Sequence, residues 1–213
     1  MRRIAIIGAG AFGIQIKNAI QHDSVEPFEI MGFFDDYQEE GSIIEGFPIL
    51  GKLDEIVIKF QEGLFDCVFI AIGYKHFMFK EELYDKLNGI VPLATIVSMN
   101  AFIHPTAKVG NGVLISNGVI INANAVVDDN TCITLRSIVN HDCFVGKHTF
   151  FSTNVSTAGH VSIGKRCFIG VGCIISDNVQ VSDDIWLSPG CVVGKDLTSS
   201  GKYMSYSMKL SKF

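Results

Sequence analysis

The sequence is poor in charge, in proline and in basic character. Charged residues make up 18% of its 213 residues, proline occurs only 5 times, and the formal net charge is −5. A chain without a basic surface does not attract phosphate backbones, so we do not expect nucleic acid as a partner. Hydrophobic residues reach 48%. That apolar content excludes a disordered chain, which would have too little to bury.

Long uninterrupted apolar runs and cysteine pairs of the CxxC type are also missing. The stretch 109–127 carries no charge but contains four asparagines, which a membrane-spanning helix would not tolerate. The apolar start of the chain looks like a short signal peptide but is broken by three glycines. The 6 cysteines show no disulfide or metal-binding pattern. We therefore predict a soluble, cytoplasmic protein without membrane insertion.

Glycine is abundant, with 21 residues, and many of the glycines belong to a six-residue repeat. From Ile103 to Val193, every sixth residue is Ile, Val, Leu or Phe, with Thr157 as the exception. A second column, four residues further on, is small or modestly apolar and includes four cysteines, which we expect in the core. The column between the two is rich in Gly, Asn and Asp, which accept left-handed backbone conformations. This pattern predicts a hexapeptide-repeat parallel β-helix with about three hexads per triangular coil.

The first hundred residues lack this period and alternate strands with helices. We expect strands over 3–7, 28–34 and 65–72, a helix from the glycine-rich loop to about residue 20, a helix over 80–87, and a strand over 93–97 that leads into the β-helix. Such alternation is typical of a parallel α/β sheet. The predicted fold class is α/β plus all-β: residues 1–100 form a small Rossmann-like nucleotide-binding domain, and residues 101–213 form a β-helix with a C-terminal tail.

The segment GAGAFG at residues 8–13 follows the first strand and matches the pattern GxGxxG. Glycines at this spacing let the backbone approach a phosphate at a helix N-terminus. Asp35 lies where a ribose-binding acid would stand. Because the α/β part has about half the size of a full dinucleotide fold, and no domain for hydride transfer follows, we expect a mononucleotide. Its diphosphate would lie at the loop and its ribose or base near Asp35 and Asp36. NAD binding and a purely structural turn are the alternatives.

Among the 6 histidines, His141 has a special position in the repeat. One coil later stands Gly159, and adjacent parallel strands lie about 4.8 Å apart. We expect His141 and the Gly159 backbone to lie side by side, so that one takes a proton and the other donates its N–H to an oxyanion, as acyl transfer requires. Asp142 is placed to orient the imidazole, and His160 is expected to stack over Asp142.

Two other roles for His141 stay open at this point. It could be structural, or it could join His148 and His160 in a metal cluster. His148 falls on a different corner of the triangular coil, so only a neighbouring subunit could bring it to such a cluster, and we expect it to be solvated. We predict no bound metal. His76, after the third strand, could face the nucleotide.

Several segments, together with the unbroken hexads, carry a resemblance that covers nearly the whole chain: IGAGAFG at 7–13, FFDD at 33–36, AIG at 71–73, VNHDCFVG at 139–146 and AGHVSIGKRCFIG at 158–170. The chain resembles the bacterial sugar-nucleotide N-acetyltransferases of the bacillosamine and perosamine type, which are grouped with the sialic-acid O-acetyltransferases. The resemblance implies a left-handed β-helix, a homotrimer, and acetyl-CoA as a co-substrate, with no tightly bound cofactor.

The resemblance also implies roles for single residues. His141 would be the catalytic base and Asp142 its acidic neighbour, and the Gly159 amide would meet the thioester carbonyl. Acetyl-CoA would lie in the groove between adjacent subunits, where Val171 and Pro189 would contact it. The other expected contacts are those of the nucleotide sugar, with Gly8, Gly10, Ala11, Phe12, Asp35, Asp36 and Gly73.

The chain departs from the family pattern at three places. Many relatives have a second histidine nine residues after the base, where this chain has Phe150. Relatives often have an arginine soon after AIG, where Tyr74, Lys75 and His76 stand here. The tail YMSYSMKLSKF lacks the family segment G-x-P-A-[KR]. We carry over no role that depends on these family residues.

The function expected on this basis is transfer of acetyl from acetyl-CoA to the amine of a 4-amino-4,6-dideoxy sugar linked to UDP, dTDP or GDP. The product would serve lipopolysaccharide, O-antigen or other glycan biosynthesis. No evident nucleophile lies beside His141, and Cys143 points inward in the repeat, so we expect direct attack by the amine without an acyl-enzyme. The alternatives are O-acetylation of a sugar hydroxyl and a non-catalytic nucleotide-binding β-helix protein.

Overall fold

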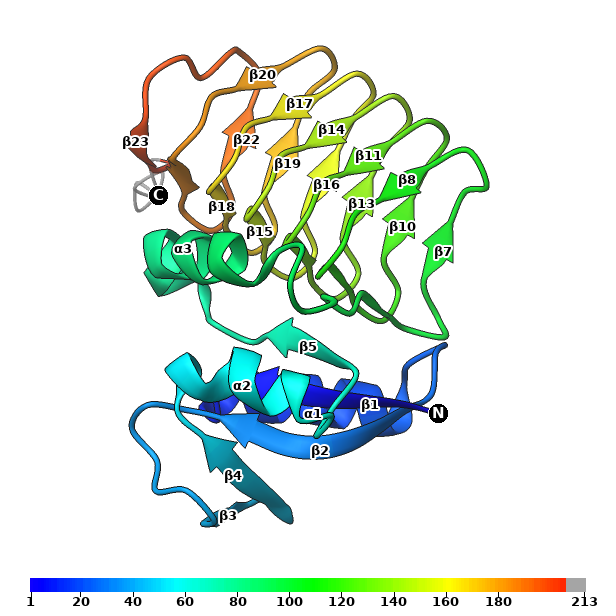
Figure 1. The fold of residues 1–213 in the computed structure, drawn as a ribbon. Helices are drawn as coiled ribbons and strands as arrows, with labels where there is room; N and C mark the ends of the chain where they lie inside the picture. Colours follow the sequence, from blue (N-terminus) through cyan, green and yellow to red (C-terminus); the bar gives the residue numbers. More distant parts are fainter. Residues whose placement is uncertain (206–213) are drawn as a thin grey trace, which may run out of the picture.

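The computed structural model describes residues 1–205, which form a small α/β domain packed against a β-helix (Figure 1). The predicted fold class is confirmed. No helix among these residues is long and apolar enough to cross a membrane. The end of the predicted tail, residues 206–213, lies outside the described residues. The elements of the α/β domain are β1 (Arg2–Ile7), α1 (Ala11–His22), β2 (Phe28–Phe34), β3 (Ile43–Ile44), β4 (Phe47–Gly51), the 3₁₀ turn η1 (Leu53–Glu55), α2 (Ile56–Gln61), β5 (Cys67–Ile70), the 3₁₀ turn η2 (Tyr74–His76) and α3 (Phe77–Leu87).

The sheet of the α/β domain has the strand order β3-β4-β2-β1-β5. Strands β2 and β5 pair in parallel with β1, β4 pairs in parallel with β2, and β3 is antiparallel to β4. Alternate residues of β1 point to opposite faces. Ile4 and Ile6 pack on the side of α1 and the β-helix, whereas Ala5 and Ile7 pack on the side of α2 and α3. Both faces of the central strand are therefore buried, as a parallel sheet requires.

Several boundaries in this domain differ from the sequence expectation. Strand β5 is shorter than predicted at both ends, and directly before it the Asp66 carboxylate accepts hydrogen bonds from the Arg3 side chain and backbone N–H. Helix α3 begins at Phe77, not at residue 80, after the 3₁₀ turn that follows Gly73. The short elements β3, β4 and α2 were not predicted, because each is too short to show a hydrophobic period.

The β-helix consists of three parallel sheets of very short strands. The β7 sheet contains β7 (Phe102–Ile103), β10 (Ile120–Ile121), β13 (Ile138–Val139), β16 (Ser156–Thr157), β19 (Ile174–Ile175) and β22 (Val192–Val193). The β8 sheet contains β8 (Lys108–Val109), β11 (Val126–Val127), β14 (Phe144–Val145), β17 (Ser162–Ile163) and β20 (Gln180–Val181). The β6 sheet contains β6 (Ile96–Val97), β9 (Leu114–Ile115), β12 (Cys132–Ile133), β15 (Phe150–Phe151), β18 (Phe168–Ile169), β21 (Ile185–Leu187) and β23 (Gly201–Tyr203).

The repeat read from the sequence determines how the coils stack. Residues 18 apart are partners, as with Ile121 and Val139 in the β7 sheet, and the large apolar column fills the interior. Corner residues between the strands adopt left-handed backbone conformations, among them Asn124 at φ 58° and Asp142 at φ 57°. All 6 cysteines are buried and unpaired. The first β-helix strand, β6, begins a few residues before the predicted boundary at residue 100.

The α/β domain packs on the outer face of the β6 sheet. The outward residues Leu114, Cys132, Phe150 and Phe168 are buried against α1 and the β1 face. Tyr74 lies across the same column, with its ring centroid 4.4 Å from that of Phe168. Helix α3 is held by polar contacts, which include Arg166 Nη1 to Glu81 Oε1 at 2.9 Å and Tyr84 Oη donating to Asp129 Oδ2 at 2.8 Å. The two domains therefore share one apolar core.

Candidate active site

His141 lies on the corner that connects the β7 sheet to the β8 sheet, called here the His141 corner. Its side chain is 47% exposed, and Nδ1 is 2.9 Å from Asp142 Oδ2. The hydrogen bond from His141, and a second one from the Asn124 side chain, lower the pKa of Asp142. An ionised Asp142 can only accept hydrogen bonds, so the Nδ1 atom that contacts it carries the proton, and Nε2 is left as the free basic nitrogen. The pair therefore has the geometry of a base and its orienting acid.

Gly159 lies directly beside this imidazole, one coil further along. A Cβ atom at this position would come within 2.4 Å of His141 Cε1 and 2.7 Å of Nε2. These distances are well below van der Waals contact, so only glycine leaves room for the ring. The expected juxtaposition of His141 and the Gly159 backbone is present in the structure.

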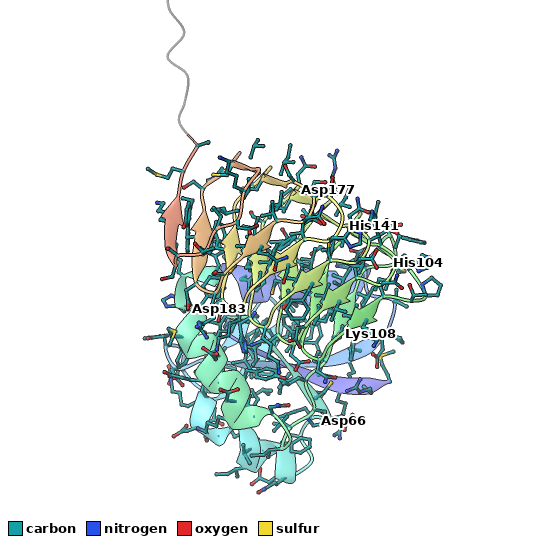
Figure 2. The ribbon with its side chains drawn as sticks, turned by 90° about the horizontal axis from the view of Figure 1, so that it is seen from above. Asp66, His104, Lys108, His141, Asp177 and Asp183 are labelled. Atoms are coloured by element: carbon teal, nitrogen blue, oxygen red, sulfur yellow. The ribbon has the colours of Figure 1, made fainter. Side chains whose placement is uncertain are left out.

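The Gly159 amide is not free, although the acyl-transfer hypothesis counted on an unobstructed N–H. It donates a hydrogen bond to Asp177 Oδ1 at 2.8 Å. The reason is the stacking of the coils, because Asp177 occupies the same repeat position as Gly159 one coil further on. Figure 2 shows Asp177 and His141 along the same edge of the β-helix. Sequence reasoning missed Asp177, although the same step of 18 residues that pairs His141 with Gly159 also leads to it.

His160 forms the other side of this corner. Its ring stands nearly perpendicular to that of His141, with centroids 5.2 Å apart. One ligand atom each from His141, Asp142 and His160 lies within 4.8 Å of the others, so these side chains could hold a metal ion. Metal binding through Nε2 of His141 would remove the free base, because both uses need the same lone pair.

The expectation for His148 is wrong. It lies on the corner between the β8 sheet and the β6 sheet, away from His141 as predicted, but it is only 2% exposed and not solvated. Helix α3 covers it: the His148 ring packs against that of Tyr84, and Nδ1 is 3.0 Å from Asn130 Nδ2. Burial lowers the pKa of His148 to about 4, and the nearby Lys80 charge acts in the same direction. His148 therefore belongs to the domain interface.

Val171 and Pro189 lie on the third corner, between the β6 sheet and the β7 sheet, called here the Val171 corner. Both are exposed, and the Gly190 N–H bonds the Val171 carbonyl across one coil. Within one chain, the β7 sheet separates them from His141. The structure therefore does not bring these two predicted acetyl-CoA contacts to the base in the same subunit.

The glycine-rich loop has the predicted close packing. Gly8 has φ +101°, and a Cβ on Gly13 would overlap the Gly8 carbonyl oxygen. Gly10 caps α1 and has open space around it, as a ligand approaching the helix N-terminus needs. Ala11 is exposed and Phe12 half-buried in the first turn of α1, while Gly73 follows β5 beside the loop.

The two acids after β2 are already engaged with backbone N–H groups. Asp35 accepts from the amides of Ala9 and Tyr37 at 2.8 and 2.9 Å, and Asp36 accepts from that of Leu53 at 2.9 Å. Asp35 therefore shapes the glycine-rich loop itself, a role that the spacing alone did not indicate. Each carboxylate can still accept further hydrogen bonds, because it has about four lone-pair sites.

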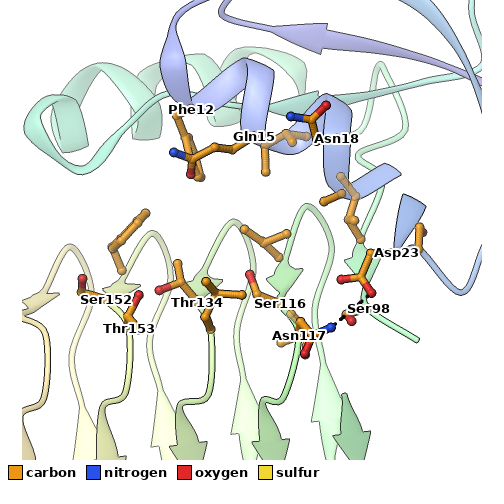
Figure 3. Close-up of a pocket in the computed structure, with 18 of the residues that line it drawn as sticks. Phe12, Gln15, Asn18, Asp23, Ser98, Ser116, Asn117, Thr134, Ser152 and Thr153 are labelled. Atoms are coloured by element: carbon orange, nitrogen blue, oxygen red, sulfur yellow. Dashed lines mark hydrogen bonds between the residues drawn. The ribbon is translucent and has the colours of Figure 1, made fainter. Parts of the chain in front are cut away.

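A cavity of about 530 Å³ lies between α1 and the Val171 corner. Figure 3 shows Phe12, Gln15 and Asn18 of α1 facing the corner side chains Ser116, Thr134 and Ser152. Sequence reasoning missed this cavity. The pattern that could have indicated it is the hydroxyl side chain directly after successive strands of the β6 sheet, a place where the repeat needs no polar group.

Two family models match the chain: the PglD N-terminal domain matches residues 3–87, and the GMPPB C-terminal domain matches residues 97–203. The chain belongs to the family of proteins with a GMPPB C-terminal domain, and the PglD N-terminal domain before it gives the chain the architecture of the sugar N-acetyltransferases that it resembles. The resemblance seen in the sequence is thereby confirmed. No curated protein sequence matches the chain.

Several solved structures share this architecture over almost their whole length. One is a histidine-to-asparagine variant of perosamine N-acetyltransferase from Caulobacter crescentus in complex with CoA and GDP-perosamine, with a TM-score of 0.84 and 25% identity over 95% of this chain and 93% of that one. The acetyltransferase domain of PglB from Neisseria gonorrhoeae, in complex with acetyl coenzyme A, has a TM-score of 0.82 and 22% identity over 96% of each chain. WeeI from Acinetobacter baumannii AYE has a TM-score of 0.66 and 23% identity over 91% of this chain and 95% of that one.

Proposed function

We propose that this family member transfers acetyl from acetyl-CoA to the amine of a nucleotide-linked 4-amino-4,6-dideoxy sugar. The observation that carries the proposal is the His141–Asp142 pair, whose accessible imidazole lies against Gly159 at a corner of the β-helix. The bound CoA and GDP-perosamine of the Caulobacter enzyme support the substrate class.

In the proposed reaction the neutral sugar amine attacks the thioester carbonyl carbon. His141 Nε2 takes one proton from the nitrogen as the C–N bond forms, and Asp142 stabilises the imidazolium that results. The Gly159 N–H donates to the oxygen of the tetrahedral intermediate. The C–S bond then breaks, the sulfur leaves as thiolate and takes up a proton, and the products are the N-acetyl sugar and CoA.

The nucleotide sugar would bind at the edge of the α/β sheet where the N-terminus of α1 and the residues after β2 lie. Its diphosphate would meet the N-terminus of α1 at Gly10 and Ala11, because unpaired helix amides attract anions. The ribose or base would take the unused lone pairs of Asp35 and Asp36. From there Phe12 leads into the cavity between α1 and the Val171 corner, whose hydroxyl and amide groups suit a sugar.

A homotrimer would complete the site. The outer face of the β7 sheet is apolar in most coils, with Phe102 53%, Ile174 51% and Val192 70% exposed. A stripe of this kind marks an interface, and a second copy presenting its own β-helix is the occupant we infer. In such an assembly the His141 corner of one subunit can face the cavity and the Val171 corner of the next. That arrangement would place Val171 and Pro189 beside acetyl-CoA.

We place the reaction in the cytoplasm. The 6 cysteines are all unpaired, as expected in a reducing compartment. The product class would be an acetylated amino sugar for surface polysaccharides.

The test is release of free thiol from acetyl-CoA in the presence of UDP-, GDP- and dTDP-linked 4-amino sugars, with a hydroxyl sugar as the comparison. We expect thiol release with at least one amino sugar and none with the hydroxyl sugar. Release with the hydroxyl sugar alone would establish O-acetylation instead, and release with neither would refute the proposal.

A further inference from the structure

The carboxylate of Asp177 accepts the hydrogen bond of the Gly159 amide, which the proposed reaction needs. Asp177 is exposed on the His141 corner, whereas Gly159 is buried, and Asp177 Oδ1 accepts the Gly159 N–H at 2.8 Å. A carboxylate oxygen at this distance stands where a negatively charged carbonyl oxygen would accept the same hydrogen bond. The N–H is a single donor, so it cannot serve both acceptors with good geometry.

In neighbouring coils, the equivalent backbone amides at this corner donate their hydrogen bonds to neutral side chains and not to an acid. The amides of Ala123 and His141 are each bonded by the side chain of the asparagine that precedes them, at 2.7 and 2.8 Å. Gly159 is preceded by an alanine, which offers no acceptor. The acceptor for its amide therefore comes from Asp177, one coil further on, and carries a negative charge.

The chain also contains the same contact where no chemistry is expected. Asp183 accepts the Lys165 amide at 3.0 Å from the same repeat position. This pair lies on the corner between the β8 sheet and the β6 sheet, and Figure 2 shows Asp183 well apart from His141 and Asp177. The contact by itself is therefore a stacking device of the fold. At Gly159, however, the amide that makes this contact lies beside the imidazole of His141, so the contact affects the amide that the proposed reaction uses.

We propose that Asp177 sets the affinity for the acyl donor: it holds the Gly159 amide in the free enzyme and yields that amide to the thioester carbonyl when acetyl-CoA binds. The inference depends on the proposed function. No covalent bond changes in this exchange, since one acceptor replaces another.

The magnitude follows from the population of the free amide. If the Asp177 carboxylate holds the Gly159 amide in most molecules, only the remaining fraction can bind acetyl-CoA through that amide. The apparent Kd is then the intrinsic Kd divided by this fraction. For a charge-assisted hydrogen bond at an exposed corner, that factor is about tenfold. CoA has a thiol in place of the thioester carbonyl. It does not need the amide, so its affinity should not depend on Asp177.

The test compares Asp177→Ala and Asp177→Asn with the matched control Asp183→Ala in the full-length chain. Calorimetry measures the Kd of acetyl-CoA and of CoA, and thermal melting monitors the fold. For Asp177→Ala we expect acetyl-CoA to bind about tenfold more tightly while CoA binding is unchanged. For Asp177→Asn, which keeps the shape but not the charge, we expect a smaller gain in the same direction. Asp183→Ala should change neither Kd.

The outcomes separate this inference from the proposed function. If wild-type protein binds neither ligand, the proposed function fails. If it binds both, and the ratio of the two Kd values is the same in wild type and both Asp177 variants, the competition is refuted. Weaker binding of acetyl-CoA in the folded Asp177→Asn variant would also refute it. If Asp177→Ala does not fold, the nearly isosteric Asp177→Asn variant decides.

Discussion

Replacing Gly159 by alanine should inactivate the protein without unfolding it. The added Cβ would lie 2.4 Å from His141 Cε1, about 1 Å closer than an ordinary carbon–carbon contact. Gly159 does not have a positive φ, so its backbone accepts alanine, and the half-exposed His141 ring can swing outward to relieve the contact. A displacement of about 1 Å at the reacting group costs on the order of 10² in rate. The free energy of unfolding should change by less than about 1 kcal/mol.

The assay is kcat by thiol release, with thermal melting on the same samples. Gly194→Ala is the matched control, because Gly194 lies further along the same corner, has no positive φ, and its Cβ would meet only Ser176 Oγ at 3.9 Å. In a His141→Ala background, where the ring is absent, Gly159→Ala should cost less than about threefold. A full loss of about 10² in that background, or wild-type activity of the single variant, would contradict the role given to the ring.

Three further predictions concern Asp142, the exposed face of the β7 sheet and the buried His148. Asp142→Asn should lower kcat about 10–10²-fold with the KM for acetyl-CoA little changed, because the amide cannot stabilise an imidazolium as the carboxylate does; steady-state kinetics checks this. Ile174→Asp should dissociate the proposed trimer in light scattering and lose activity with it, and an active monomer would contradict the proposed shared site. The folded pKa of His148, about 4, lies below the unfolded value of 6.5. Protonation therefore favours the unfolded chain, and stability that is full above about pH 6.5 should decline by up to about 3 kcal/mol as the pH falls toward 4. Urea unfolding of wild type against His148→Gln should show this slope only in wild type.

The β-helix could be predicted almost completely from the sequence, because one period specifies both its core and its corners. Every hexad up to Val193 repeats the same local conformation, so the alignment of Ile121 with Val139 extends over these coils. In the last coil the step shortens, and Leu197 and Tyr203 pair with residues 16 positions earlier. The α/β domain was predictable only where its strands are long and apolar, as in Phe28–Phe34. The two-residue strand β3 and the six-residue helix α2 have no period to detect, and tertiary contacts determine them.

The part of the candidate site that could be predicted is the part set by the 18-residue step between equivalent positions of successive coils. That step places Gly159 beside His141 and Asp177 on the amide of Gly159. The first contact could be predicted from the step alone, whereas the second depends also on Ala158, which offers the amide of Gly159 no acceptor. The burial of His148 could not be read from the repeat, since its corner position is normally solvated. It is buried because α3, an element outside the repeat, covers it with Tyr84 and Lys80.

The stacking of the coils also explains why the site lies at this corner. Any corner places identical backbone positions about 4.8 Å apart, so a side chain on one coil always lies over the backbone of the next. At most corners that neighbour carries a Cβ, which would displace an imidazole. A glycine one coil after a histidine leaves room for the ring directly over the backbone, as at Gly159. The His141–Gly159 step provides this contact, and Asp177 is the residue that the next step of the same column brings to it. His141, Gly159 and Asp177 are therefore three consecutive members of one column, and changing any one of them should change the environment of the other two.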